Sequence, residues 1–119
     1  MGCKMIGLHF DDCAPFFSAP VFENCQLSLS SFLECKLQGV VFSKCILDEA
    51  DFTGADLTSA NFEGSSLAKT VFENTNLSKA DLRDAVHYQI DPNKNKLRKA
   101  RFSLEGCQGL LVYFGVIID

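Results

Sequence analysis

The sequence predicts a solenoid, a stack of short coils in which each coil contacts only its neighbours. Three observations lead to this fold. A Phe or Leu stands at every fifth position thirteen times in succession, and a small or compact residue stands two positions before each of them. The two positions after each large residue are mostly polar and turn-forming, as at Thr53-Gly54 and Ser78-Lys79.

A period of five fits neither regular element. Five residues of α-helix turn by about 500°, so successive large residues would be displaced by roughly 140°. In a β-strand they would alternate between the two faces. The chain must therefore change direction after each pentad and point one large side chain toward a common axis. These predicted core positions are Phe22, Leu27, Phe32, Leu37, Phe42, Leu47, Phe52, Leu57, Phe62, Leu67, Phe72, Leu77 and Leu82.

The small positions explain most of the cysteines. Cys3, Cys13, Cys25, Cys35 and Cys45 all occupy the small inward position, where cysteine serves as a compact hydrophobe. No Cys-x-x-Cys pair or zinc spacing is present, so we expect no metal site. Cys25 and Cys45 would stack in adjacent coils at a distance that permits a disulfide, but without a secretion signal we expect reduced thiols.

The clearest copies of the repeat carry a family resemblance. Ala50-Asp51-Phe52, Ala55-Asp56-Leu57, Ala60-Asn61-Phe62 and Ala80-Asp81-Leu82 resemble the pentapeptide-repeat family, whose word is Ala-(Asp/Asn)-(Leu/Phe)-x-x. The resemblance covers residues 20 to 84 well and 1 to 19 loosely. It implies an all-β fold, a right-handed quadrilateral β-helix with four pentads per coil and about 4.8 Å between coils.

In a coil with four faces, large residues 20 positions apart stack on the same face and form a column. Phe22, Phe42, Phe62 and Leu82 would stack on one face and Phe32, Phe52 and Phe72 on the opposite one, with leucines on the other two. The segment "VHYQIDPNKNKLRK" does not match the repeat motif, and we expect the register to resume over 99–103. The predicted organisation is a β-helix over 1–105, with a register shift near 13–20 and an irregular last coil over 85–98, followed by a C-terminal segment over 106–119.

The chain begins at residues that fit core positions of a coil, Met5 and Phe10. Two alternatives stay open: a short member of the family, or further coils on the N-terminal side. No stretch approaches the roughly 20 apolar residues of a membrane span, and no signal peptide is apparent, so we expect a cytoplasmic protein.

The C-terminal segment is strongly apolar. Its candidate residues are Leu110, Leu111, Val112, Tyr113, Phe114, Val116 and Ile117. A solenoid end must be covered, because the last coil exposes core and unpaired backbone. These residues would either cap their own chain or pair two solenoids end to end, and we expect a two-fold homodimer.

Charge is the most informative surface feature. The net charge is −6 over residues 1–84 and +2 over residues 85–119. On the face of Phe32, Phe52 and Phe72 the outward charges are Glu34, Asp51 and Glu73, with no Lys or Arg. A negative face of this kind could present a field similar to that of duplex phosphates.

Catalytic motifs are lacking: we find no glycine-rich phosphate loop, no nucleophile elbow and no His–carboxylate pair at motif spacing. We therefore expect no enzymatic activity and no cofactor. The basic run "KNKLRKAR" has no aromatic stacking platform in a chain of net charge −4, so we expect a solvated loop and no direct nucleic-acid binding.

Within the family, the segments "CKMIG" and "YQIDPNKNKLRKARFSLEGCQGLL" are most similar to the subgroup of Qnr quinolone-resistance and microcin-immunity proteins. This resemblance implies a DNA mimic that binds DNA gyrase or topoisomerase IV and protects it from inhibitors such as quinolones. Unlike several of these proteins, the chain has no long loop projecting between residues 20 and 84. The alternative is a general interaction scaffold with an unrelated partner.

Overall fold

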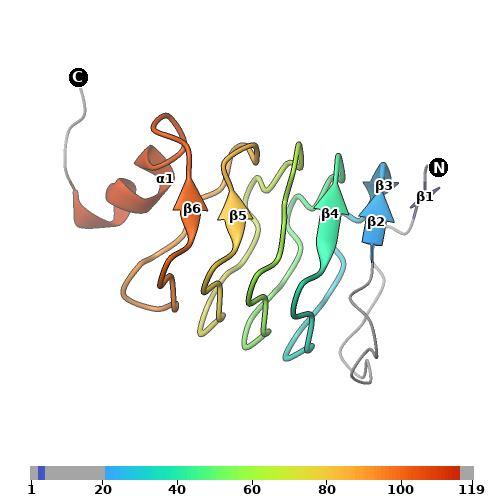
Figure 1. Cartoon of the computed structure of the whole chain (residues 1–119), viewed down its shortest axis with the longest axis horizontal. Coiled ribbons are helices and arrows are strands. Elements are labelled where there is room, and N and C mark those ends of the chain that lie inside the picture. The colour runs from blue at the N-terminus through green and yellow to red at the C-terminus, as the bar shows by residue number, and fades with distance from the viewer. Residues whose placement is uncertain (1–2, 5–20, 116–119) are drawn as a thin grey trace.

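The computed structural model is an elongated stack of coils, drawn in Figure 1, with overall dimensions of 41 × 24 × 21 Å. It describes the backbone of residues 3–4 and 21–115 and the side chains of residues 21–113 and 115. The N-terminal coils lie at one end of the stack, and a helical turn lies at the other.

Short parallel pairings between successive coils hold the stack together. The strands are β1 (Cys3–Lys4), β2 (Val21–Glu23), β3 (Cys25–Gln26), β4 (Val41–Ser43), β5 (Asp81–Leu82) and β6 (Arg101–Phe102). Strand β2 pairs with β4 and β5 with β6, both at an offset of 20 residues, and single bridges such as Ser31 to Asp51 repeat that offset. The predicted β-helix with four pentads per coil is confirmed. In the β1–β3 pair Cys3 lies opposite Cys25, so that coil is two residues longer.

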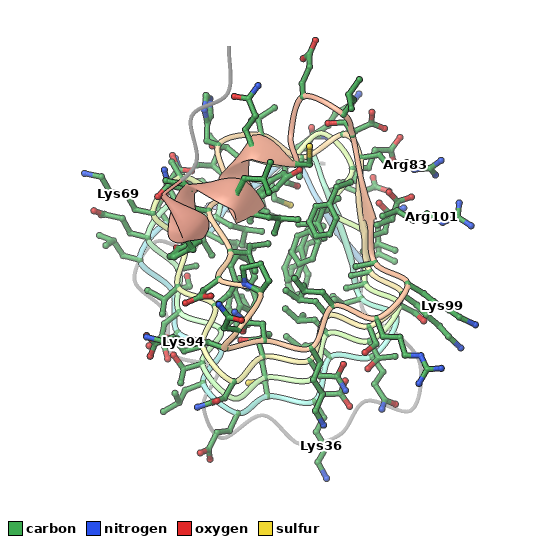
Figure 2. All side chains as sticks on the ribbon, turned by 90° about the vertical axis from the view of Figure 1, so that its left-hand side faces the viewer. Lys36, Lys69, Arg83, Lys94, Lys99 and Arg101 are labelled. Atoms are coloured by element: carbon green, nitrogen blue, oxygen red, sulfur yellow. The ribbon has the colours of Figure 1, made fainter. Side chains whose placement is uncertain are left out.

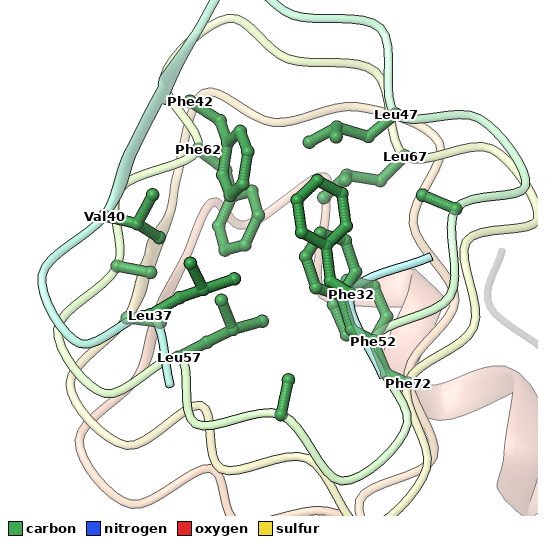
Figure 3. Close-up of a cluster of buried hydrophobic side chains, with 14 of the residues drawn as sticks. Phe32, Leu37, Val40, Phe42, Leu47, Phe52, Leu57, Phe62, Leu67 and Phe72 are labelled. Carbon is green, nitrogen blue, oxygen red and sulfur yellow. The ribbon is translucent and has the colours of Figure 1, made fainter. Parts of the chain in front are cut away.

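The large residues of the repeat fill the axis of the stack. The positions from Leu27 to Leu82 are all buried and Phe22 is half-buried. Figure 3 shows two columns of phenylalanine rings between two columns of leucines. Within a column the rings stack, with centroids 4.8 Å apart for Phe32 and Phe52. Between columns they meet edge to face, with centroids 5.9 Å apart for Phe42 and Phe52. Both are favourable aromatic geometries.

Buried hydroxyl groups tie one coil to the next. The hydroxyls of Ser65, Thr70 and Thr75 occupy the small inward position and donate to the carbonyl oxygens of Phe42, Leu47 and Phe52, over 2.7, 2.8 and 2.8 Å. Each of these carbonyls lies 23 residues earlier, in the preceding coil. Polar side chains are therefore tolerated in the core because their hydrogen bonds are satisfied there.

The turns at the corners of the coils explain which residues occupy the outward positions of the repeat. In the pentads from 20–24 to 75–79 the last residue turns the chain in the left-handed region, with φ of 56° at Glu34, 69° at Gly54 and 61° at Lys79. The Asp or Asn before the large residue accepts the N–H two residues further on, as Asp51 Oδ1 does from Thr53 over 2.9 Å and Asn76 Oδ1 from Ser78 over 3.1 Å. This local bond stabilises the turn and favours Asp or Asn at that position.

The cysteines agree with the sequence expectation in part. Cys25 and Cys45 are buried and form no disulfide with each other, although they stand in adjacent coils. Cys35 is disulfide-bonded, so the expectation that every thiol is reduced is wrong at this position.

The last coil recovers its register earlier than predicted. Lys96 bridges to Asn76 at the usual offset, so the register returns before the expected segment 99–103. Asn95 takes the small inward position: its Nδ2 donates to the carbonyls of Phe72 and Asp91, and its Oδ1 accepts the N–H of Thr75. Three hydrogen bonds allow a polar residue to replace the usual Ala or Thr, which is why the repeat is hard to recognise here.

A helical turn covers the C-terminal end of the stack (Figure 1). It comprises α1 (Gln108–Leu111) and the 3-10 helix η1 (Val112–Phe114), so the expectation of an all-β chain needs this correction. The backbone approaches the last coil closely: Ile90 N–H donates to Gly109 O over 3.0 Å, and a Cβ at Gly109 would lie 2.2 Å from Tyr88 O. Within the described residues, no helix is long and apolar enough to cross a membrane.

Among the described residues, the Tyr88 hydroxyl is the one buried side-chain polar atom without a hydrogen bond of good geometry, although Ser103 lies close enough to lower its pKa in part. Its ring packs against Phe102 with centroids 5.6 Å apart, and its hydroxyl lies beneath Gly106. Burial, followed by the nearby Cys107, raises the pKa of Tyr88 to about 12. The site therefore favours the neutral phenol.

We predict that Tyr88→Phe stabilises the protein. Removing a buried hydroxyl that lacks a hydrogen bond of good geometry should raise the free energy of unfolding by about 1 kcal/mol at pH 7. Because the pKa of about 12 in the folded chain lies above the usual value of 10.0, wild-type stability should fall as the pH rises from 10 toward 12, and the variant should lose less.

Denaturant unfolding at pH 7 and pH 11 measures both effects. Tyr113→Phe is the matched control, since that hydroxyl donates to Gln89 O over 3.3 Å and its loss should bring no gain. A Tyr88→Phe variant less stable than wild type at pH 7 would contradict the prediction.

Candidate interaction surfaces

The three predicted acidic residues lie on one face of the stack, one in each of three successive coils. We call this surface, formed by Glu34, Asp51 and Glu73, the acidic face. It covers the column of Phe32, Phe52 and Phe72, whose rings stack in order. The carboxylates therefore rise along the axis by about 4.8 Å per coil. Leu33 and Val71 lie on the same face and interrupt the charge.

The three carboxylates differ in what they can offer a partner. Glu34 and Glu73 are exposed, whereas Asp51 is half-buried. Asp51 Oδ1 accepts the N–H of Thr53 over 2.9 Å and the hydroxyl of Thr53 over 2.5 Å. Asp51 thus stabilises its own turn, whereas no such turn bond is found for the Glu34 carboxylate within the described residues. The Cγ of Glu34 lies over Gly54, where an added Cβ would be 3.0 Å away.

The acidic face ends at a lysine that the sequence analysis did not include. Lys94 Nζ lies 3.9 Å from Glu73 Oε1, and both side chains are more than half exposed. The pentads of Phe32, Phe52 and Phe72 carry no Lys or Arg, and Lys94 stands on the same face in the next coil. Asn74 N–H donates to Lys94 O over 2.8 Å, which shows the usual 20-residue offset. Extending that offset past residue 84 would have found Lys94 in the sequence.

A shallow cavity of about 250 Å³ joins the acidic face to the C-terminal segment. Glu73, Asp91 and Lys94 line one side, and Tyr113 of η1 lines the other. Burial, followed by the charges of Asp91 and Glu73, raises the pKa of Tyr113. The last helical turn therefore stands beside the end of the acidic face.

The predicted residues of the C-terminal segment divide into two groups. Leu110 packs against the core and Leu111 is half-buried, so both help to cover the last coil. Val112 and Tyr113 are 50% and 46% exposed. The side chain of Phe114, and both Val116 and Ile117, lie outside the described residues. The segment thus packs on the core through Leu110 and presents apolar surface at Val112 and Tyr113.

No group of three or more His, Cys, Asp or Glu side chains in the described part of the chain is arranged to hold a metal ion.

Comparison with known proteins identifies the family of this repeat. A family model described as the pentapeptide repeat region matches residues 1–72, well over half of the chain. The chain belongs to the pentapeptide-repeat family. No curated protein sequence matches it significantly.

Solved structures of pentapeptide-repeat proteins share the fold. A trypsin-treated variant of QnrB1, a plasmid-mediated fluoroquinolone resistance protein, superposes with a TM-score of 0.82 at 18% identity and covers 98% of this chain. The chain spans 56% of that structure. HetL of the cyanobacterium Nostoc sp. strain PCC 7120, involved in heterocyst differentiation regulation, gives a TM-score of 0.62 at 18% identity, with 85% of this chain and 43% of HetL covered.

A pentapeptide-repeat protein of the Arabidopsis thaliana thylakoid lumen gives a TM-score of 0.50 at 25% identity, with 67% of this chain and 49% of that chain covered. These neighbours show the right-handed β-helix fold that the repeat implied. They have different roles, so the fold alone assigns none of them to this pentapeptide-repeat chain.

We predict that the charge of Asp51 and its hydrogen bonds can be separated by mutation. Asp51→Asn keeps an oxygen for the turn and should change stability by less than about 0.5 kcal/mol. Asp51→Ala leaves the N–H and hydroxyl of Thr53 without their acceptor and should cost about 1 kcal/mol.

Thermal unfolding of the two variants and of Glu34→Ala checks this. Glu34→Ala removes a charge from the same face without removing a turn bond, so it should resemble Asp51→Asn. Equal losses for Asp51→Asn and Asp51→Ala would show that the charge, and not the turn bond, sets the effect.

Proposed function

We propose that this protein is a non-catalytic DNA mimic that binds a type II topoisomerase, DNA gyrase or topoisomerase IV, and protects it from inhibitors such as quinolones. The observation that carries the proposal is the overlap of nearly the whole chain with QnrB1, a fluoroquinolone resistance protein. The sequence resemblance to the Qnr and microcin-immunity subgroup points the same way.

The acidic face supplies a physical basis for the mimicry. Glu34 and Glu73 are exposed and Asp51 is half-exposed, on a straight stack with one coil about every 4.8 Å. A surface of regularly repeated negative charge can enter a groove that a DNA-binding protein keeps for phosphates. Lys94 limits the acidic face at its C-terminal end. The coils of residues 31–75 would therefore make most of the contacts with the partner's DNA-binding groove.

A general interaction scaffold is the second candidate. Its support is that HetL and the Arabidopsis protein carry the same fold in other settings. A scaffold would also use exposed outer columns but would have no preference for a DNA-binding enzyme.

A gyrase supercoiling assay with and without a fluoroquinolone tests the proposal. Wild type should restore supercoiling in the presence of the drug. The variant Glu34→Gln/Asp51→Asn/Glu73→Gln removes the acidic face but keeps the turn bond of Asp51, and it should require about tenfold more protein for the same protection.

The control variant Glu49→Gln/Glu63→Gln/Asp84→Asn removes three exposed charges from other faces and changes the net charge equally. It should protect as wild type does. Equal loss in both triple variants would reject the acidic face as the binding surface. No protection of gyrase or topoisomerase IV by folded wild type would favour the scaffold.

We further propose that the C-terminal segment forms a two-fold homodimer. Val112 and Tyr113 remain about half exposed after Leu110 has packed on the core. Apolar side chains left exposed at the end of a solenoid are suited to an end-to-end contact with a second copy.

Sedimentation equilibrium at micromolar concentration should show a dimer, and Val112→Lys should shift it to monomer. Val86→Lys is the matched control, because Val86 is similarly exposed at 46% but lies on the side of the stack. A wild-type monomer at these concentrations would exclude the homodimer.

A further inference from the structure

Lysine and arginine side chains gather on the last two coils, and apart from Lys94 they lie away from the acidic face. Residues 79–101 contain seven Lys or Arg and three Asp or Glu, for a net charge of +4, whereas residues 21–78 contain three and eight, for −5. Figure 2 shows Arg83, Lys99 and Arg101 on one side of the stack and Lys69 and Lys94 on the other. Three of the positive side chains of residues 79–101 therefore lie together on one side of the stack.

We call the residues Lys79, Lys96, Arg98, Lys99 and Arg101 the basic strip. All five are exposed. The ion pairs found among the described side chains, Arg83 with Asp81 and Lys94 with Glu73, include none of them. Arg101 faces the neighbouring Asp81 and contributes to the lowered pKa of its carboxyl, but the hydrogen bonds of Arg83 are the larger cause. The strip thus keeps its charge available for a partner.

Backbone pairing fixes the strip in place. Lys96 bridges to Asn76 and Arg101 pairs with Asp81 between β5 and β6. Lys79 N–H donates to Arg98 O over 2.9 Å. Lys79 and Lys99 hold the same corner in successive coils, both with φ of 61°. The run that the sequence presented as a solvated loop is therefore part of a coil, and its cations extend over roughly 15 Å of chain.

From these exposed, unpaired cations on an ordered coil, we infer that the basic strip binds the phosphodiester backbone of duplex nucleic acid without reading its sequence. Phosphate contacts require only positive charge and N–H donors, and they carry no sequence information. The earlier expectation of no nucleic-acid binding rested on the lack of an aromatic platform. Such a platform serves single strands, whose bases are unstacked, so its absence does not argue against a duplex.

An acidic protein surface is the competing partner. Protein interfaces usually place aromatic or aliphatic residues at their centre. The described neighbours of the strip along its columns are instead polar, with Asn76, Ser78 and Asp81 in the preceding coil. Leu104 is 90% exposed, but it follows Arg101 at one end of the strip and not at its centre. The arrangement therefore suits a phosphate backbone better.

The strip and the acidic face point in different directions, so each can be occupied without blocking the other. An enzyme that holds DNA could contact the acidic face while its DNA contacts the strip. The inference does not depend on that enzyme, because duplex binding by the isolated protein can be measured directly.

Fluorescence anisotropy of a labelled 20-base-pair duplex tests the inference. At 20 mM salt we expect a Kd on the order of 10 µM, which weakens with a log–log salt slope of about −3 to −4 if three to four phosphates are contacted. The variant Arg98→Gln/Lys99→Gln/Arg101→Gln should bind at least about tenfold more weakly, with a slope smaller by about three.

The variant Lys36→Gln/Lys44→Gln/Lys69→Gln is the matched control, with the same change in net charge at exposed lysines outside the strip. Lys69 lies on another face, and Lys36 lies in the column of Lys96 but three coils before it. It should stay within about threefold of wild type. Circular dichroism establishes that both variants are folded. Equal loss in the two triple variants would overturn the inference, as would no binding at 20 mM salt.

Two further arms separate this inference from its alternatives. Polyglutamate that displaces the duplex as efficiently as unlabelled duplex does would overturn the inference in favour of an acidic protein partner. The variant Glu34→Gln/Asp51→Asn/Glu73→Gln should bind the duplex at least as well as wild type, because it removes negative charge. Its duplex binding should persist even where topoisomerase protection is lost, so the two proposals can fail independently.

Discussion

From residue 21 onward each described coil returns to the same register after 20 residues, and the rest of the structure depends on that constraint. Parallel backbone hydrogen bonds join each coil to the next, as from Phe52 N–H to Val71 O over 2.9 Å. The register places ring on ring in the core and turn on turn at the corners. A residue's surroundings are therefore set by its place in the pentad and by the residues 20 positions before and after it.

The constraint explains why the core accepts hydroxyls and an amide but the corners accept almost any residue. Thr75 and Asn95 occupy the small inward column because each finds a carbonyl of the preceding coil. At the corners the left-handed conformation is shared by Glu34, Gly54 and Lys79, and the side chains of Glu34 and Lys79 are exposed there. Charge at these outer positions can vary without disturbing the stack. Surface function is thus free to differ between members that share one core.

The two charged surfaces follow from this freedom. The acidic face uses outward positions of three middle coils, and the basic strip uses outward positions at the end of the stack. Lys94, at the junction, pairs with Glu73 and separates the acidic face from the end that α1 covers. Asp51 serves both local structure and charge, which is why Asp51→Asn tests its charge more cleanly than a reversal to Lys. The regular register of the stack sets the spacing and direction of these charges.

The sequence by itself determined the repeat, the inward and outward positions and the membership of each side chain in a column, because a strict five-residue period leaves one large side chain per pentad for the core. It also predicted Glu34, Asp51 and Glu73 on one face. Only the tertiary structure decided the last coil, where Asn95 hides the register by making its hydrogen bonds to another coil. It also placed the basic strip on an ordered coil and formed the helical turn over residues 108–114. These features depend on contacts between residues about 20 positions apart, or on the contact of the C-terminal segment with the last coil, and no local pattern records them.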